Sequence, residues 1–548
     1  MNYFLTYTVY VLILSVLMGI STWKLFKKMG YSPLFAFIPF YNYFIILKET
    51  KHPKWWAVLS YLPIVGPIMM SVFHIYLMKK FGKTLFQHQL LTVILPFIYM
   101  ATVNYSKNAE VEDESANDLF LTDEEKETKK KDTFIGSITF AVVFATIIHV
   151  FVTQPFGIPT GSMERTLLVG DFLFVNKWSY GYRLPMRPVA IPFLQGTIMD
   201  TGQKGNPKDD PKSYVDAVKL PYERIFQFNK PQRKDVVVFN YPQDSVHTAI
   251  DRKDPYVKRC VAVAGDTFEM RAGRLFVNGK AETFLGDQEV QHRYIVNTGS
   301  QLDIPGLYNT FGFLPVQEIP NGNGFVYAFQ GLTDKTAAEI KKLPQVIDMK
   351  EEIQAKGEAA VYYKDDAKTK IDTTQSIFPI NKAWNQDWYG PLKIPKKGDI
   401  VALNQETLPE YRWIISEYEH NSLENKNGKI FINGKETNQY TIQQDYYMMI
   451  GDNRDASLDA RFFGFVPEEN IVGKPMFTWM SVQGVFSDAS STYQAPKKIR
   501  WDRMFKATNT GEANKTSYWW IAAMILILFF GWEYFVKLFR KNKKEESL

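Results

Sequence analysis

The strongest candidate for acid–base chemistry is Lys258, in a run of β-branched and small residues, Val257-Lys-Arg-Cys-Val-Ala-Val-Ala264. The run predicts a strand, and alternate residues share one face, so Lys258 lies in line with Cys260, Ala262 and Ala264. A lysine among small apolar side chains is partly desolvated, which lowers its pKa and favours the neutral amine. Such an amine can act as a general base, although an edge-strand lysine whose amine reaches water would show the same pattern.

A candidate nucleophile, Ser162, lies in the segment Gly157-Ile-Pro-Thr-Gly-Ser-Met163. Proline and glycine favour a tight, exposed turn at this point. A serine whose proton is taken by a lysine amine is one form of nucleophilic catalysis without histidine. The alternative is an ordinary turn at the end of a strand, which an isolated Thr-Gly-Ser would also form.

Other reaction classes lose support. The chain has no GxSxG, HExxH or Walker motif, and no GxGxxG placed between a strand and a helix. Cys260 is the single cysteine, which excludes an intrachain disulfide and a CxxC site, and its apolar strand predicts a buried, unreactive thiol. No histidine has the spacing of a metal site, and we expect surface or packing roles for His247, His292 and His420. We therefore predict no metal or organic cofactor.

Four blocks of sequence occur in a fixed order after an apolar segment. They are IPTGSM ending at Met163, GDFLFVNKWSYGYR from Gly170, YVKRCVAVAGD from Tyr256, and GDNRDASLDARFFGFVP from Gly451. Together they closely resemble the type I signal peptidases, over about residues 155–274 and 446–475. The resemblance implies a membrane-bound serine endopeptidase that removes N-terminal signal peptides from exported preproteins through an acyl-enzyme.

The resemblance also implies roles for individual residues. Ser162 would be the nucleophile and Lys258 the general base, with Met163 beside them. The Ser162 backbone N–H and the Thr160 hydroxyl would form the oxyanion hole, and Ser457 would hydrogen-bond Lys258 and orient its amine.

Charged residues around this dyad would support it. The resemblance implies an ion pair between Asp459 and Arg461, with Asp452 and Arg259 as further scaffold. One position departs from the family pattern, because Arg165 stands where a proline usually follows the Ser-Met pair. This departure leaves the course of the turn after Ser162 open.

An extended substrate would bind as a strand beside the segment that begins with Ile158 and Pro159. Shallow apolar pockets there would admit small side chains, which match the small-residue end of a secretory signal. The expected partners are signal peptides of preproteins and the lipid bilayer, with export machinery as a further candidate.

Several apolar runs approach the roughly 20 residues that span hydrocarbon. They are Phe4–Trp23, Trp55–Leu77, Leu85–Tyr105, Phe134–Val152 and Tyr518–Val536. A further apolar run, Tyr31–Leu47, contains two prolines and suits an interfacial piece as well as a span. Basic residues precede the Phe134 run and follow the Tyr518 run, so both flanks are predicted to be cytoplasmic. The polar region between them would lie on the periplasmic side of a bacterial cytoplasmic membrane, in a multi-pass protein.

We expect a mostly β fold, with an antiparallel β catalytic domain of signal-peptidase type and a large β-rich insertion. N-terminal transmembrane helices and one C-terminal transmembrane helix would anchor it. Strands are predicted at 171–176, 235–241, 256–263 and 274–277, and a helix at 333–342. Residues 233–239 and 273–280 recur in order as 397–403 and 428–435, which indicates two related hairpin modules with Asn-Gly turns.

The predicted organisation follows the chain. It comprises an N-terminal membrane region (1–105), a charged cytoplasmic linker (106–132), an anchor (133–155), the first part of the catalytic domain (156–287), the insertion (288–394), a second β module with the rest of the catalytic domain (395–516), a C-terminal transmembrane helix (517–537) and a basic tail (538–548).

Composition limits the alternatives. With 46% hydrophobic and 22% charged residues, the 548-residue chain is too apolar to be mainly disordered. A net charge of +6 with no basic stripe argues against nucleic acid as a partner. Two other hypotheses stay open: a non-catalytic membrane-tethered β-domain that acts as a scaffold or chaperone for exported proteins, and a Ser/Lys protease of the LexA-like self-cleaving class. The second would need a DNA-binding motif, which is not apparent.

Overall fold

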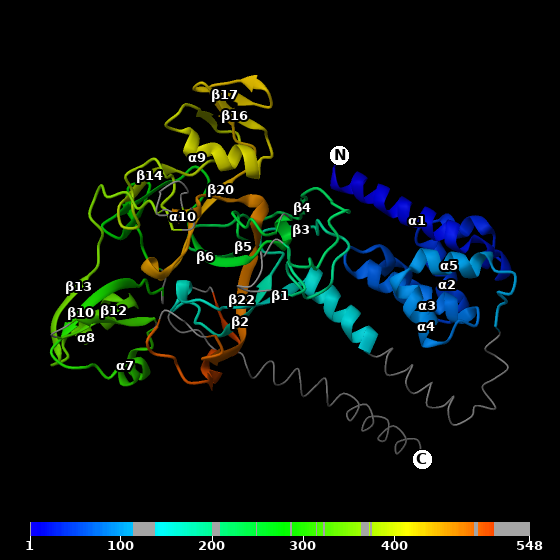
Figure 1. Ribbon diagram of the computed structural model, residues 1–548, viewed down its shortest axis with the longest axis horizontal. Helices are drawn as coiled ribbons and strands as arrows, with labels where there is room; N and C mark the ends of the chain where they lie inside the picture. Colours follow the sequence, from blue (N-terminus) through cyan, green and yellow to red (C-terminus); the bar gives the residue numbers. More distant parts are fainter. Residues whose placement is uncertain are drawn as a thin grey trace, which may run out of the picture. The chain divides into compact units, whose positions relative to one another are not determined.

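The computed structural model describes residues 2–112, 138–199, 209–247, 249–284, 288–313, 315–321, 324–362, 372, 375–486 and 491–508. The chain divides into two compact units (Figure 1). The first unit comprises Met1–Thr153, Gly181–Phe226 and Asp244–Asp254, and the second comprises Gln154–Tyr180, Gln227–Gln243 and Pro255–Leu548. All the residues predicted to take part in catalysis belong to the second unit.

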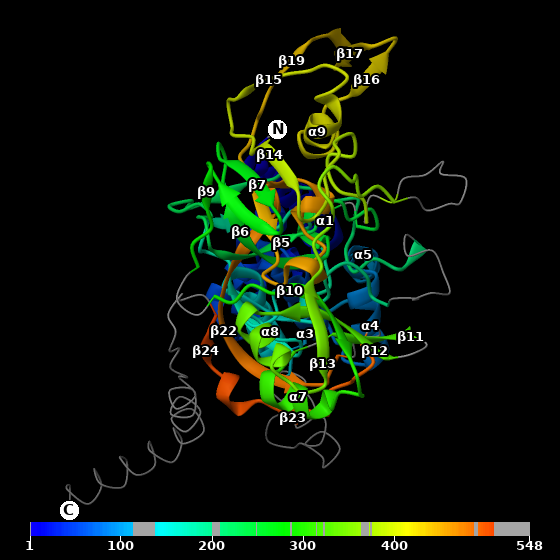
Figure 2. The same cartoon turned by 90° about the vertical axis from the view of Figure 1, so that its left-hand side faces the viewer.

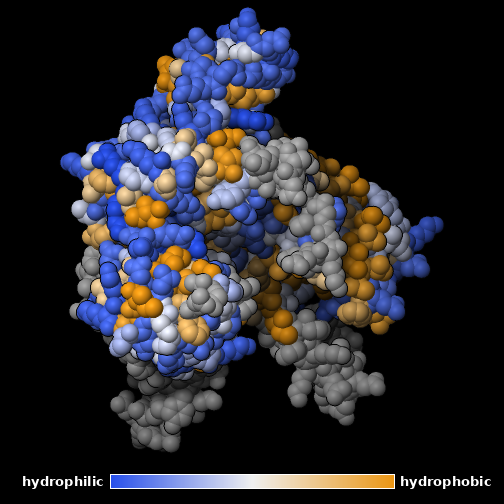
Figure 3. Space-filling model, turned by 60° about the vertical axis from the view of Figure 1, so that its left-hand side comes forward, coloured by the Kyte–Doolittle hydropathy of each residue, from blue (hydrophilic) through white to orange (hydrophobic). Residues whose placement is uncertain are grey.

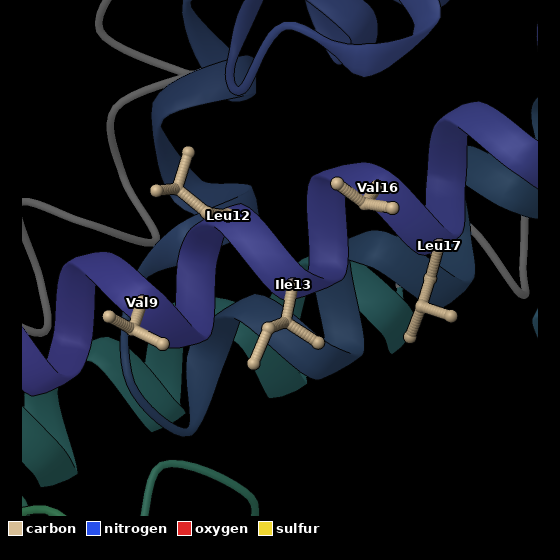
Figure 4. Close-up of a pocket in the computed structure, with 5 residues that line it drawn as sticks. All are labelled: Val9, Leu12, Ile13, Val16 and Leu17. Carbon is tan, nitrogen blue, oxygen red and sulfur yellow. The ribbon is translucent and has the colours of Figure 1, made fainter.

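The first unit begins with α1 (Tyr3–Lys28), whose first turn is capped by the Asn2 side chain. At 1.5 Å per residue, its 26 residues are long enough to cross the roughly 30 Å hydrocarbon core. Within the described residues, α1 is the helix that is both long and apolar enough to do so. Figure 4 shows side chains that project from one stretch of it, and each is at least 40% exposed: Val9, Leu12, Ile13, Val16 and Leu17.

The remaining apolar runs of this unit form shorter pieces. Neither Trp55–Leu77 nor Leu85–Tyr105 forms the continuous helix that a simple span requires. The chain turns at Pro63 in the first run and at Pro96 in the second, because proline lacks the N–H that would continue the helix. The helical pieces are η1 (Pro33–Phe37), α2 (Tyr41–Glu49), η2 (Lys54–Tyr61), α3 (Val65–Lys80), α4 (Phe86–Ile94) and α5 (Pro96–Tyr105).

The Phe134 run contributes a shorter apolar helix, Ile138–Phe151. The first unit also contains the small β3–β4 pair (Tyr182–Arg183 with Arg224–Ile225). The predicted C-terminal helix at 517–537 and most of the predicted linker lie outside the described residues.

The second unit is built on one large sheet, in the order β1-β2-β22-β5-β6-β20-β21 (Figure 1). The pairs from β2 to β21 are antiparallel. The strands are β1 (Thr153–Gly157), β2 (Asp171–Asn176), β22 (Ile471–Gln483), β5 (Val236–Asn240), β6 (Pro255–Ala262), β20 (Tyr446–Ile450) and β21 (Val466–Pro467), with β23 (Lys498–Ile499) and β24 (Lys506–Ala507) also paired to β22. The predicted antiparallel β fold is confirmed, and the predicted strand at 171–176 has the observed bounds.

The core of the sheet lies around its central strands. All five residues of β5 and all five of β20 are buried, as expected for strands covered on both faces. In β2 the burial alternates, so one face packs inward and the other carries Phe172 and Phe174 at partial exposure. Cys260 is fully buried in this core, which confirms the predicted burial, and burial raises the pKa of its thiol, as expected for an unreactive cysteine.

The predicted insertion contains a second sheet, in the order β11-β12-β10-β13. Its strands are β10 (His292–Thr298), β11 (Val316–Asn321), β12 (Gly324–Leu332) and β13 (Val346–Glu351), and its helices are α7 (Ile304–Phe311) and α8 (Asp334–Lys341). Helix α8 packs against β12 and β13 (Figure 2). The helix predicted at 333–342 is confirmed, with Thr333 as the N-cap that accepts the Thr336 N–H. We call residues 288–352 the insertion module.

The sequence echo produces two similar hairpins. The first is β7 (Thr267–Arg271), β8 (Arg274–Val277) and β9 (Lys280–Ala281), and the second is β16 (Leu423–Lys426), β17 (Lys429–Ile432) and β18 (Lys435–Glu436). In both Asn-Gly turns the two central residues have positive φ, which is the conformation that type I′ turns require. The predicted relation between the two modules is therefore confirmed.

The two hairpins differ in their surroundings. Strand β7 pairs with β14 (Tyr389–Lys393) and buries Phe268 and Met270. The second hairpin is largely exposed, and Figure 3 shows a mostly hydrophilic surface on this projecting part, at the top of the view. Further elements of this unit are β15 (Ile400–Ala402), which pairs with β19 (Gln439–Thr441), α9 (Leu408–Trp413), and α10 (Ala460–Phe463), which contacts β20.

Candidate active site

Ser162 lies in a short helical turn, Gly161–Met163, that follows β1. The chain entering the turn is fixed by Ile158, which pairs with both Gly170 and Asp171 through backbone hydrogen bonds of 2.9 Å. Met163 is fully buried and packs with Ile158 and Leu167, which holds the turn against the sheet. Ser162 itself is 7% exposed.

Lys258 lies on β6, between β5 and β20, where Val237 is its register partner. Its Nζ lies 2.7 Å from Ser162 Oγ, and the lysine is 4% exposed. Burial lowers the pKa of the Lys258 amine to about 8, while the Asp459 and Asp452 charges oppose this shift and Arg461 adds to it. A substantial share of the amine is therefore neutral near pH 8, as a general base must be.

A buried ion pair joins the strand of Lys258 to the turn of Ser162. Arg259 contacts Asp452 through two hydrogen bonds, of 2.7 and 2.5 Å, and both side chains are almost fully buried. The Thr166 hydroxyl, four residues after Ser162, donates to the same carboxylate at 2.5 Å. The neighbouring Asn453 donates its backbone N–H to the Ser162 carbonyl and its side-chain amide to the Gly161 carbonyl.

A second buried pair lies behind the amine. Arg461 donates two hydrogen bonds of 2.9 Å to Asp459, and neither residue is exposed. Burial acts to raise the pKa of the Asp459 carboxyl, but the Arg461 charge outweighs burial and the pKa lies below its usual value. The structure thus contains the ion pair expected from the sequence.

Ser457 does not make its expected hydrogen bond to Lys258. Its hydroxyl is buried and lies close enough to Asp459 to help lower the pKa of that carboxyl, and no hydrogen bond joins it to Lys258 in the described part of the chain. The Lys258 amine is directed to Ser162 instead, and Ser457 Oγ lies against Gly451, where an added Cβ would approach it to 2.3 Å. The predicted contact is therefore wrong, although Ser457 does lie beside the site.

The dyad opens into a cleft of about 510 Å³, a volume within the range of ligand sites. One wall is the segment before Ser162, including the sequence-predicted Ile158, Pro159 and Thr160. The rest of the lining is mainly apolar: Phe156, Gly157, Met163, Leu173, Val238, Pro255, Tyr256, Val257, Ala456 and Leu458. Pro159 and Thr160 are exposed, so this wall is accessible to an extended ligand.

Arg165, the departure noted in the sequence, has a φ of 71°. Proline is locked near −65° and cannot adopt this conformation, so the turn differs from one that carries proline here. The contacts of Thr166 and Gln291 could not be predicted from the sequence, because their partners Asp452 and Arg454 are more than 150 residues away in the chain. The role of Asn453 could have been inferred from its place in the GDNRD block.

The described residues include one group with the geometry to hold a metal ion, Asp244, His247 and Asp254. Asp244 already accepts the backbone N–H groups of Val246, His247 and Asp254 and contacts the His247 ring at 2.8 Å. These hydrogen bonds show that the Asp244 side chain holds the 244–254 loop together, which explains why the three residues lie close to one another. The cluster belongs to the first unit, whereas Ser162 and Lys258 belong to the second.

The family described as signal peptidase, peptidase S26, matches residues 131–328 and 389–480, which is more than half of the chain. The chain belongs to this family. Ser162 and Lys258 lie within the first matched range, and the GDNRD block lies within the second. Residues 34–112 match a second family, DUF5684, whose function is unknown.

Curated relatives of the signal peptidase family match much of the chain. Signal peptidase I of Haemophilus influenzae is 26% identical over 477 residues, covering 85% of this chain and 98% of the relative. Signal peptidase I of Helicobacter pylori is 26% identical over 378 residues, covering 68% of this chain and 92% of the relative. That of Buchnera aphidicola subsp. Schizaphis graminum is 26% identical over 349 residues, covering 63% and 73%.

Proposed function

We propose that Ser162 and Lys258 form the catalytic dyad with which this member of the signal peptidase family cuts N-terminal signal peptides from preproteins. The chain is a serine endopeptidase by its family. The observation that carries the assignment of the dyad is the 2.7 Å distance between Lys258 Nζ and Ser162 Oγ, with both residues buried at the end of an open cleft.

In the first half of the reaction, the neutral Lys258 amine takes the proton of the Ser162 hydroxyl. The Ser162 oxygen forms a bond to the scissile carbonyl carbon, and the negative charge collects on the carbonyl oxygen. The Ser162 backbone N–H and the Thr160 hydroxyl would donate to that oxygen, and one such donor is worth about 3 kcal/mol. The carbon–nitrogen bond then breaks, and the Lys258 ammonium returns its proton to the leaving amine.

In the second half, water attacks the resulting ester. Lys258 takes a proton from this water, the hydroxyl adds to the acyl carbon, and the ester bond to Ser162 breaks. The Lys258 ammonium then protonates the Ser162 oxygen, which restores the starting dyad. Burial supports both halves because it lowers the pKa of the amine to about 8, so that about half of it is neutral at that pH.

The substrate would bind as an added strand beside Ile158 and Pro159, since this segment leads to Ser162 and lines the cleft. The apolar lining of the cleft, without a charged residue other than Lys258, favours small uncharged side chains. Such side chains are typical of the end of a secretory signal.

The protein would act at a membrane. Helix α1 carries an exposed apolar face, and the outer side of the β2–β22 pair carries partly exposed aromatic residues that suit an interface with lipid. These residues are Phe172, Phe174, Phe477 and Trp479. The site would lie on the periplasmic side of the bacterial cytoplasmic membrane, between the anchor at 133–155 and a C-terminal transmembrane helix at 517–537. Confinement of enzyme and precursor to one bilayer raises their effective concentration.

We extend the proposal to the multi-pass organisation and domain bounds expected from the sequence, with a membrane region at 1–105, the catalytic domain at 156–287 and 395–516, and the insertion at 288–394. Contact with export machinery is a further part of it. Labelling of the 106–132 linker, the C-terminal tail and the N-terminus from each side of the membrane tests the topology. Labelling of the linker or the tail from the periplasmic side alone would contradict its cytoplasmic location, and labelling of the N-terminus establishes the orientation of α1.

The decisive experiment is an assay of the purified full-length protein on a preprotein. Ser162→Ala and Lys258→Ala are expected to abolish processing, because each removes one partner of the dyad. Processing at the wild-type rate by either variant would refute the assignment. A serine-directed acylating reagent should label the wild-type protein and not Ser162→Ala, whereas a non-catalytic scaffold would show no such difference.

A further inference from the structure

The turn after Ser162 is tied to the insertion module through Arg165. The guanidinium donates to the backbone carbonyl of Phe311 and lies 3.5 Å from the Thr336 hydroxyl oxygen. It also lies 3.6 Å from the Glu289 carboxylate. These three partners come from the end of α7, the first turn of α8 and the chain before β10, so one side chain contacts three parts of the module.

The end of α7 is well suited to bind this cation. Gly312 follows Phe311 in the left-handed conformation and ends the helix, which leaves backbone carbonyls without partners inside the helix. The last turn of a helix also carries a partial negative charge that favours a guanidinium. The end of α7 therefore offers Arg165 both a hydrogen-bond acceptor and a partial negative charge.

The backbone at Arg165 is unusual for its residue type. A φ of 71° is in the left-handed region, which side chains other than glycine, asparagine and aspartate rarely adopt. Such conformations persist where surrounding contacts determine them. The contacts of the guanidinium with the module supply that constraint.

A second connection joins the module to the other side of the serine turn. Gln291 donates its backbone N–H to the Asp452 carbonyl, and its own carbonyl accepts the Arg454 N–H, each at 3.0 Å. Its side chain donates to the Gly331 carbonyl in β12. Asn453, between those two partners, is the residue that donates to the Ser162 carbonyl. The module thus contacts both sides of the turn.

We propose that Arg165 is a positioning residue: it joins the turn of Ser162 to the insertion module and so makes the module part of the structure that holds the nucleophile against Lys258. This inference rests on the proposed dyad and adds a task for the insertion, which otherwise contributes no side chain to the cleft among the described residues. The module acts through Arg165 and Gln291 and touches no reacting atom.

The test separates the backbone conformation from the guanidinium. Arg165→Gly keeps the left-handed conformation without strain, because glycine adopts positive φ readily, but it removes the tie to the module. Arg165→Lys keeps a positive charge that can reach one of the acceptors. It lacks the planar guanidinium, whose several N–H donors can contact more than one acceptor at once. Arg271→Ala is the matched control, since Arg271 is exposed, pairs with Glu269 and contacts neither the module nor the turn.

All variants are assayed as full-length enzymes on one preprotein, with kcat and KM measured separately. We expect Arg165→Gly to lower kcat by about 10- to 100-fold with little change in KM, because a small displacement of the nucleophile costs that much. Arg165→Lys should recover part of the loss, and Arg271→Ala should match the wild type. Hydrogen exchange should become faster in the 160–167 segment of Arg165→Gly and stay unchanged in β5 and β6.

A kcat within twofold of wild type for Arg165→Gly, or a rise in KM alone, would overturn the proposal. If that variant does not fold, Arg165→Asn is judged by the same criteria, since asparagine also tolerates positive φ. Ser162→Ala is assayed in parallel. If it is inactive while Arg165→Gly is normal, the role of Arg165 fails and the dyad stands. If Ser162→Ala processes normally, the dyad itself fails.

Discussion

Lys258 and Ser162 meet at one point, but they are held in place by different kinds of structure. Lys258 lies on β6, which has hydrogen-bonded neighbours on both sides, β5 and β20. Ser162 lies on a three-residue turn, held by a backbone hydrogen bond from Asn453 to Ser162, by one from Leu167 to Met163, and by side chains such as Thr166. A strand inside a sheet is fixed by a repeated ladder, whereas a turn depends on a few specific contacts.

The comparison indicates that the sheet and the turn determine different properties of the site. The sheet sets the environment of the base, since burial between strands is what lowers the pKa of Lys258. The turn sets the position of the nucleophile, and the Arg259–Asp452 pair connects the two. Changes on the strand should therefore alter chemistry and pH dependence, and changes around the turn should alter alignment and stability.

The largest effect is expected on the strand. Lys258→Met keeps the volume and the apolar stem but removes the base, so kcat/KM should fall about 10³-fold or more, given that general bases contribute about 10²- to 10⁴-fold. Cys260→Ala is the matched control two residues along the same strand and should retain activity within a few-fold. Steady-state kinetics on a preprotein measure both. Loss of activity in Cys260→Ala with retention in Lys258→Met would reverse the roles assigned to these residues.

The connection between strand and turn should give the next largest effect. Asp452→Asn leaves Arg259 as a buried charge without its partner, and breaking a buried pair in this way costs about 3–5 kcal/mol of unfolding free energy. Chemical denaturation of the purified protein measures it. Glu269→Gln breaks the more exposed pair with Arg271 and should cost no more than about 1 kcal/mol. Equal losses in the two variants would show that burial does not distinguish the pairs.

The pH profile tests the environment of the base. Because the pKa of Lys258 is lowered to about 8, the reactive neutral amine dominates above that pH and decreases below it. We expect kcat/KM to fall about tenfold per pH unit well below the pKa, and about 50-fold between pH 8 and pH 6, because half of the amine is already protonated at pH 8. A histidine base would instead give a midpoint near 6.5. A midpoint near 10.4 would mean that Lys258 is not desolvated.

The smallest effect is expected for one contact of the turn. Thr166→Val removes the hydroxyl that donates to Asp452 with little change in shape, which should cost about 1–3 kcal/mol of unfolding free energy and a few-fold of kcat. Thr283→Val, which alters an exposed hydroxyl that contacts Lys234, should change neither. A Thr166→Val enzyme that equals the Thr283→Val enzyme in both measurements would show that the turn does not depend on this hydrogen bond.

Much of the local structure followed from the sequence. The β-branched and aromatic run at 171–176 predicted β2, the helix predicted at 333–342 matches α8, and both Asn-Gly pairs predicted their hairpin turns. These features depend on neighbours within a few residues, so they are visible in a single sequence. Of the candidate site, the dyad residues and the Asp459–Arg461 pair were anticipated.

The errors concern contacts between distant segments. Ser457 was expected to orient Lys258, but its position against Gly451 is set by the packing of the loop. The apolar runs of the first unit looked like simple spans by composition, yet Pro63 and Pro96 divide them. Arg165 was seen as a departure from a pattern, and its partners at 289, 311 and 336 could not be inferred because no local signal connects them.

The sequence by itself determined which side chains are present and which local elements carry them: a lysine on an apolar strand and a serine after a Pro-Thr-Gly turn. Only the tertiary structure brought their reactive atoms within 2.7 Å across 96 residues of chain and removed water from around the amine. The physical reason is that hydrogen-bonded turns and strand periodicity are short-range properties of the chain. Distance and desolvation depend on the packing of segments that are remote in sequence.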